Sequence, residues 1–138
     1  MPDAPWRQTW LGRGGHQKHK LGWQAERYVA QRLTAMGYRI IERNVVTRAG
    51  EIDVVAEHGK FLCFIEVRSR REDSPLRPRE TLTAKKRRRM VRCAESYMRS
   101  KRLLDRSYRF DLAEVSFDDR QRVKGFNVIE AVSTAKRR

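Results

Sequence analysis

Carboxylates stand inside the most apolar stretch of this sequence, and that combination limits what the chain can fold into. Residues 50–70 read GEIDVVAEHGKFLCFIEVRSR, and the runs around IDVVA and FLCFIEV have the β-branched and aromatic composition of buried strands. Asp53 and Glu66 lie within these runs. A buried carboxylate is costly unless a cation or hydrogen-bond donors compensate its charge. The stretch therefore predicts two paired strands whose acids have partners.

A short turn joins the two apolar runs. Residues 58–60 carry the turn, and the flanking strands are expected at Glu51–Glu57 and Phe61–Arg68. Pairing about this turn places Asp53 opposite Glu66 or within a residue or two of it. Two neighbouring carboxylates repel each other unless a cation lies between them. A hard divalent ion such as Mg²⁺ uses such a pair, with water completing its octahedron.

Ion pairs are an alternative explanation for the same acids. Because side chains alternate along a strand, Glu66 and Arg68 share a face with Leu62 and Phe64. Arg68 could compensate the charge of Glu66, and another arginine could bind Asp53. The residues alone leave the metal site and the ion pairs as two open interpretations.

Two helices and three further strands complete the expected fold. Apolar residues recur at spacings of three and four over Lys18–Met36 and over Thr83–Arg102, which predicts amphipathic helices. Strands are expected at Tyr38–Val46, Tyr108–Phe117 and Val123–Val132. The order α-β-β-β-α-β-β indicates an α/β fold in which helices flank a mixed β-sheet.

Length and composition limit the class of protein. A chain of 138 residues makes one domain, which we expect at residues 16–132, between a flexible basic N-terminal arm at 1–15 and a basic C-terminal tail at 133–138. The absence of a long apolar run or a signal peptide indicates a cytoplasmic protein. Cys63 and Cys93 are expected to be reduced packing residues.

The charge balance points to a polyanionic partner. The sequence has 32 Lys and Arg against 17 Asp and Glu, which gives a formal net charge of +15. A cytosolic domain this basic is expected to bind nucleic acid. A membrane surface fits less well, because it calls for a basic amphipathic helix whose apolar face has no core to join. The oligomeric state, monomer or homodimer, is left open by the sequence.

The helical spacing adds two residues to the candidate site. Glu26 borders the buried stripe of the first expected helix, which makes it a candidate third acid beside the strand acids. Lys86 lies four residues before Met90 and eight before Ala94, on the inward stripe of the second expected helix. Lys85 is turned away from that stripe by about 100°.

The motifs in order resemble those of the YraN family of bacterial proteins. They are GWQAERYVAQRLTAMGYRIIERN, GEIDVVA, FIEVRSR, TAKKRRRMVRCAESYM and YRFDLAEV, and they extend over about residues 18–132. The fold of that family is similar to the restriction-endonuclease-like superfamily, in particular to archaeal Holliday junction resolvases. The resemblance implies a metal-dependent endonuclease or resolvase-like domain that hydrolyses DNA phosphodiesters, with Mg²⁺ or Mn²⁺ as the cofactor.

The superfamily's active-site pattern can be placed residue by residue. It has an Asp, then a Glu-x-Lys one hairpin later, often with a Glu from the first helix. These positions fall on Asp53, on Glu66, Val67 and Arg68, and on Glu26. The resemblance implies that the three acids are metal ligands, with Asp53, Glu66 and Arg68 in catalytic roles. The backbone carbonyl of Val67 is a further candidate ligand, since it lies between Glu66 and Arg68.

One position departs from the pattern, because the superfamily's lysine is Arg68 here. A guanidinium stays protonated and cannot act as a base, although it binds phosphate and stabilises transition-state charge. Lys86, in the family's Thr-x-x-Lys stretch, is the candidate catalytic substitute, and Glu51 of the Gly-Glu-Ile-Asp signature is expected to support the site. The departure favours the alternative of a non-catalytic nucleic-acid-binding module that retains the nuclease fold. The residues expected to contact nucleic acid are Arg70, Arg71, Lys85, Arg87 and Arg88.

Overall fold

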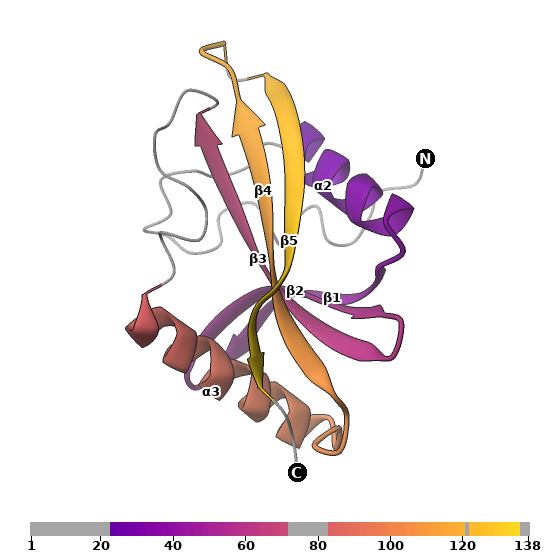
Figure 1. The fold of residues 1–138 in the computed structure, drawn as a ribbon, viewed down its shortest axis with the longest axis vertical. Coiled ribbons are helices and arrows are strands. Elements are labelled where there is room, and N and C mark those ends of the chain that lie inside the picture. Colours follow the sequence, from indigo (N-terminus) through magenta and orange to yellow (C-terminus); the bar gives the residue numbers. More distant parts are fainter. Residues whose placement is uncertain (1–22, 72–82, 121, 136–138) are drawn as a thin grey trace.

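In the part of the chain that the structure describes, five strands form a single mixed sheet with two helices packed against it (Figure 1). The computed structural model describes residues 23–71, 83–120 and 122–135, so the expected N-terminal arm lies outside the described residues. The elements are α2 (Trp23–Ala35), β1 (Arg39–Thr47), β2 (Gly50–His58), β3 (Phe61–Arg71), α3 (Ala84–Ser100), β4 (Tyr108–Phe117) and β5 (Val123–Ala135). This confirms the expected order α-β-β-β-α-β-β.

The sheet has the strand order β1-β2-β3-β4-β5, with β3 at its centre. Neighbouring strands are antiparallel except for β3 and β4, which run parallel and are connected through α3. A parallel pair needs a long crossover, which is why the helix lies between these two strands in the sequence. Two strands extend by three residues beyond their expected ends: β3 continues to Arg71 rather than Arg68, and β5 to Ala135 rather than Val132. The bounds of β1 and β2 differ from the expected ones by one residue at each end.

The β2–β3 hairpin turns at the expected place, with a turn one residue shorter than the expected 58–60. His58 pairs with Phe61, so Gly59 and Lys60 alone connect the strands. Gly59 has φ +61°, a left-handed conformation that glycine adopts without steric cost. This register brings Val54 opposite Ile65 and carries the acid-bearing ends of both strands to the same part of the sheet.

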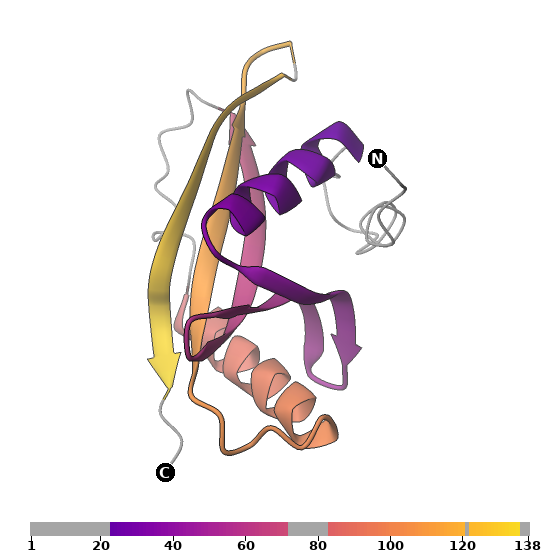
Figure 2. The ribbon, with the colours of Figure 1, turned by 90° about the vertical axis from the view of Figure 1, so that its right-hand side faces the viewer.

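Helix α2 covers one face of the sheet. Its buried residues Val29 and Leu33 pack with Val54, Cys63 and Ile65, which alternate with the residues of the opposite face. The side-chain alternation of β2 and β3 thus divides the apolar residues between two clusters. Figure 2 shows the β1–β2 hairpin twisting away from β3, β4 and β5 to lie between α2 and α3.

Helix α3 covers the other face. Its residues Ala94 and Tyr97 are buried with Val55, Leu62 and Phe64, and the Phe64 and Tyr97 rings meet edge to face at 5.9 Å. Because this cluster lies beside the middle of β3, where Glu66 stands, the packing of α3 fixes the distance between the helix and the strand acid.

A buried network of hydrogen bonds connects Tyr38, which follows α2, to Asp111 and Arg109 of β4. The fully buried Asp111 carboxylate accepts hydrogen bonds from Tyr38 Oη at 2.6 Å, from Arg109 Nε at 3.0 Å and from the Ala131 N–H at 2.9 Å. Arg109 Nη2 also lies 2.7 Å from His58 Nδ1. Every charge in the network therefore has a partner, as burial in a low-dielectric interior requires.

The fold also bears on the two cysteines and on membrane-spanning helices. Cys63 and Cys93 are both free and buried, which confirms their assignment as packing residues. Within the described ranges, neither helix has the length and apolar composition that a membrane crossing demands.

Candidate functional site

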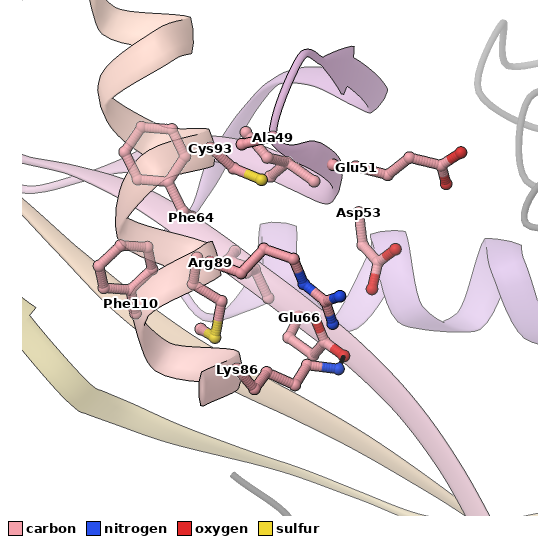
Figure 3. A pocket seen from close by; sticks show the side chains of 13 residues that line it. Ala49, Glu51, Asp53, Phe64, Glu66, Lys86, Arg89, Cys93 and Phe110 are labelled. Carbon is pink, nitrogen blue, oxygen red and sulfur yellow. Dashed lines mark ion pairs between the residues drawn. The ribbon is translucent and has the colours of Figure 1, made fainter. Parts of the chain in front are cut away.

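A pocket of about 290 Å³ lies where the start of β2, the middle of β3 and the first half of α3 meet (Figure 3). Its polar wall consists of three acids, Glu51, Asp53 and Glu66, and two cations, Lys86 and Arg89. Its apolar wall includes Ile52, Phe64, Met90, Cys93 and Phe110. The strand acids and the helix cation Lys86 that the sequence singled out thus line one pocket, together with Arg89.

The Asp53 side chain is held by a backbone N–H of β3, just beyond the last residue pair between β2 and β3. The last regular pair between β2 and β3 is Val54 with Ile65, and beyond it the Asp53 carboxylate accepts the Val67 N–H at 2.8 Å. A side chain thus replaces the backbone partner that Val67 would otherwise take from β2. The expectation that Asp53 lies within two residues of a position opposite Glu66 is confirmed.

The Asp53 carboxyl has a perturbed pKa. Burial is the largest cause and the Glu66 carboxylate the second, and together they raise the pKa of Asp53 to about 7. The Val67 N–H and the Lys86 ammonium act in the opposite direction without offsetting them. A carboxylate is therefore held where its negative charge is disfavoured, which is the electrostatic condition that a bound cation relieves.

Glu66 is held by cations from two elements. Lys86 Nζ of α3 lies 2.8 Å from Glu66 Oε2, and Arg68 Nε of β3 lies 3.6 Å from the same oxygen. The Thr83 hydroxyl caps α3 by accepting the Lys86 N–H at 3.1 Å, so the cap fixes the turn that presents Lys86. The ion-pair interpretation of Glu66 is therefore part of the observed geometry, and Lys86 is its nearer partner.

A glycine allows α3 to approach the acids. Gly50 begins β2 with φ +148°, and a Cβ at this position would lie 3.3 Å from Cys93 Sγ and 3.7 Å from Arg89 Cδ. A side chain at residue 50 would therefore press on α3 beside the pocket. This close approach gives the glycine of GEID a physical reason.

Arg89 is a site residue that the sequence analysis missed. Figure 3 shows its side chain extending from α3 toward the Asp53 and Glu66 carboxylates. It follows Lys86 by three positions, and residues three apart share a helix face. That spacing was a usable signal, but Arg89 is hidden in a run of five basic residues that the inward stripe alone does not resolve.

The remaining candidates are placed as follows. Glu51 is exposed at the pocket's edge, and Lys85, Arg87 and Arg88 are exposed on α3. Arg71 is exposed at the end of β3. The side chains of Glu26 in α2 and Arg70 in β3 lie outside the described residues, so the third acid stays a prediction.

The donor set near Asp53 and Glu66 suits a hard divalent ion. Within the described residues no three His, Cys, Asp or Glu side chains converge as a metal cluster. Mg²⁺ seldom has such an all-protein cage, because it keeps several waters and takes one or two carboxylates together with substrate phosphate. Two carboxylates on one pocket wall, one with a raised pKa, meet that requirement.

The comparisons with known proteins place this α/β chain in a bacterial family. The uncharacterised protein family UPF0102 matches residues 25–115, and the chain belongs to it. A UPF0102 protein of Alkaliphilus metalliredigens is 38% identical over 107 residues, which cover 78% of this chain and 94% of the relative. One of Moorella thermoacetica is 41% identical over 113 residues, covering 82% and 94%. One of Chlorobium limicola is 36% identical over 115 residues, covering 82% and 89%.

Proposed function

We propose that the protein is a metal-dependent nuclease-type hydrolase that acts on DNA phosphodiesters. The observation that carries the proposal is the pairing of Asp53 and Glu66 on one pocket wall, facing Lys86 and Arg89 of α3. Acids and cations in one hollow suit a phosphodiester, because it brings negative charge that the cations bind and needs an activated water. Family membership assigns no reaction, so the proposal rests on this geometry.

Asp53 and Glu66 would hold Mg²⁺ or Mn²⁺, with the Val67 carbonyl and Glu26 as further candidate ligands. The ion would supply Lewis-acid polarisation of the phosphoryl oxygen and a lowered pKa for coordinated water. Lys86 and Arg89 would bind the non-bridging phosphate oxygens and stabilise the charge that develops on them. Arg68, 3.6 Å from Glu66, would hold the orientation of that carboxylate.

A cleavage assay on defined DNA tests the proposal. Linear, flapped and four-way DNA would each be incubated with the full chain in Mg²⁺, in Mn²⁺ and in EDTA. We expect cleavage of at least one substrate with either metal and none in EDTA. Asp53→Asn should abolish cleavage, whereas Asp119→Asn, which changes an exposed acid after β4, should not.

The alternative of a non-catalytic DNA-binding module is an outcome of the same assay. It is favoured by the Lys86–Glu66 ion pair, which compensates one of the two acids without a metal. A module of that kind would bind the substrates equally in metal and in EDTA and would leave all of them intact. Intact DNA in every condition, with binding preserved, would replace the hydrolase proposal with this alternative.

A further inference from the structure

One face of α3 carries a straight row of basic side chains. Lys85, Arg88, Arg92 and Arg99 are all exposed, and at 100° per residue they fall within about 60° of one another around the helix axis. The opposite side of the helix is the buried one, where Cys93, Ala94, Tyr97 and Met98 join the core. In Figures 1 and 2 α3 is an outer layer of the molecule, so the row faces outward.

The charge of this row is not neutralised by ion pairs within the described part of the chain. None of the four side chains forms an ion pair with another residue of the described part of the chain, and the first turn of α3 contains no acid. Like charges three and four positions apart destabilise a helix, and cations near its N-terminus oppose the helix dipole. The repulsion among these cations destabilises the free protein, and a bound polyanion would reduce that repulsion.

The row begins at the pocket and leads away from it. Lys86 and Arg89 line the pocket, and they are the sequence neighbours of Lys85 and Arg88 in the row. From Lys85 to Arg99 the helix rises about 21 Å, at about 1.5 Å per residue. Each strand of a duplex carries one phosphate per about 3.4 Å of its axis, so the row spans about six base-pair steps.

The composition of the face favours a duplex over a single strand. Proteins that hold single strands stack the bases on exposed aromatic side chains. The only aromatic residue of α3 is Tyr97, which is buried, so the row offers charge without a stacking platform. A straight set of cations matches the stiff backbone of double-stranded DNA, whose persistence length is about 50 nm.

We propose that α3 binds a double-stranded arm of the DNA substrate that is about six base pairs long or longer. This arm would lie next to the phosphodiester bond that is cleaved at the pocket. This inference rests on the proposed function for the identity of the substrate. It adds a requirement that the carboxylates do not impose: DNA without such an arm should bind weakly even when the phosphodiester is accessible.

Salt-dependent binding in EDTA tests the row without using catalysis. Fluorescence anisotropy would measure the affinity of the full chain for flapped DNA over a range of salt concentrations. Arg92→Gln should lower the slope of log affinity against log salt by about 0.9, and Arg92→Gln with Arg99→Gln by about 1.8, because each removes one phosphate contact. Lys124→Gln is the matched control, since it removes an exposed cation on β5 and should leave the slope unchanged.

Arm length gives the second readout. Affinity should rise as the duplex arm is lengthened to about six base pairs and then level off, and a single-stranded arm of equal length should not replace it. An unchanged slope in the double variant, or equal affinity for single-stranded arms, would overturn the inference. If the protein cleaves DNA with metal but the salt slope of the double variant is unchanged, only the inference about α3 is refuted and the hydrolase proposal stands. Slope changes without cleavage in any metal would refute the hydrolase and leave the α3 surface standing.

Discussion

The Lys86 ammonium lies 2.8 Å from the Glu66 carboxylate and joins the first turn of α3 to the central strand of the sheet. This contact places a helix cation beside the acid that the family resemblance predicts to be catalytic, and near Arg68, where that resemblance predicts a lysine. Substitutions of Lys86 can therefore test whether this lysine replaces the one that the resemblance predicts at position 68.

We expect Lys86→Ala to lower metal-dependent cleavage by about 10²-fold or more, as the loss of one transition-state charge partner does elsewhere. DNA binding should stay within a few-fold of wild type, because the exposed basic residues of α3 remain. Single-turnover cleavage and anisotropy would be measured on the same protein. Lys124→Ala is the control, since Lys124 is an exposed cation on β5, outside the pocket and outside α3.

Lys86→Arg separates two roles for this residue. A phosphate-binding cation should keep much of its activity as arginine, whereas a general base should lose nearly all of it, because a guanidinium stays protonated. Arg68→Lys should be tolerated if Lys86 has the superfamily lysine's role. Undiminished cleavage in Lys86→Ala would rule out both roles and assign the function to Arg68.

The raised pKa of Asp53 predicts that this residue destabilises the metal-free protein at neutral and higher pH. The folded-state pKa of about 7 exceeds the ordinary value of 3.8, so between these values the folded state binds more protons than the unfolded one. The contribution of Asp53 to stability therefore falls as pH rises from about 4 to about 7 and stays low above that range.

Asp53→Asn should accordingly increase the free energy of unfolding in EDTA at pH 8, by about 1–2 kcal/mol. The amide oxygen can still accept the Val67 N–H, and the partly buried negative charge at residue 53 is removed. At pH 4.5 the difference from wild type should shrink. Urea denaturation at both pH values would measure it, with Asp119→Asn as the exposed control. An Asp53→Asn variant that is less stable than wild type at pH 8 would contradict this electrostatic account.

The Asp111 network predicts a separate, purely structural effect. Asp111→Asn would remove the nearest carboxylate of the buried Arg109 guanidinium, leaving only Glu130 Oε1 at 3.7 Å from Arg109 Nη2 among the described residues, and should cost about 3–5 kcal/mol. Tyr38→Phe removes the hydrogen bond that Tyr38 Oη donates to Asp111 at 2.6 Å and the long one that it accepts from Arg109 Nη2 at 3.5 Å, and it should cost about 1–3 kcal/mol. Urea denaturation would measure both variants. A loss in Asp111→Asn no greater than in Tyr38→Phe would mean that the charge of Asp111 is not what holds Arg109.

Local periodicity was enough to predict the elements and the inward residues. The spacing of Lys86 from Met90 and Ala94 predicted its inward position, and strand alternation put Glu66 on the face of Phe64; the ion pair to α3 agrees with both. Each of these predictions depends on a repeat of two or 3.6 residues, which a short sequence window contains.

Contacts between distant segments could not be predicted in this way. Asp111 sits in an apolar strand as Asp53 does, yet its partner Tyr38 is 73 positions away and its role is to hold the core. Nothing in the local pattern distinguishes an acid that holds a core from one that lines a pocket. The hydrogen bond from Val67 to Asp53 likewise depends on where the β2–β3 ladder ends, which strand periodicity does not fix.

Calorimetric titration of the metal-free protein with Mn²⁺ and with Mg²⁺, alone and beside DNA, tests most directly whether Asp53 and Glu66 form a metal site. The account predicts measurable binding by the wild-type chain, at least about tenfold weaker binding in Asp53→Asn and in Glu66→Gln because each loses a ligand, and wild-type binding in Asp119→Asn. No heat from the wild-type chain with either ion, even beside DNA, or equal binding by Asp53→Asn, would contradict it.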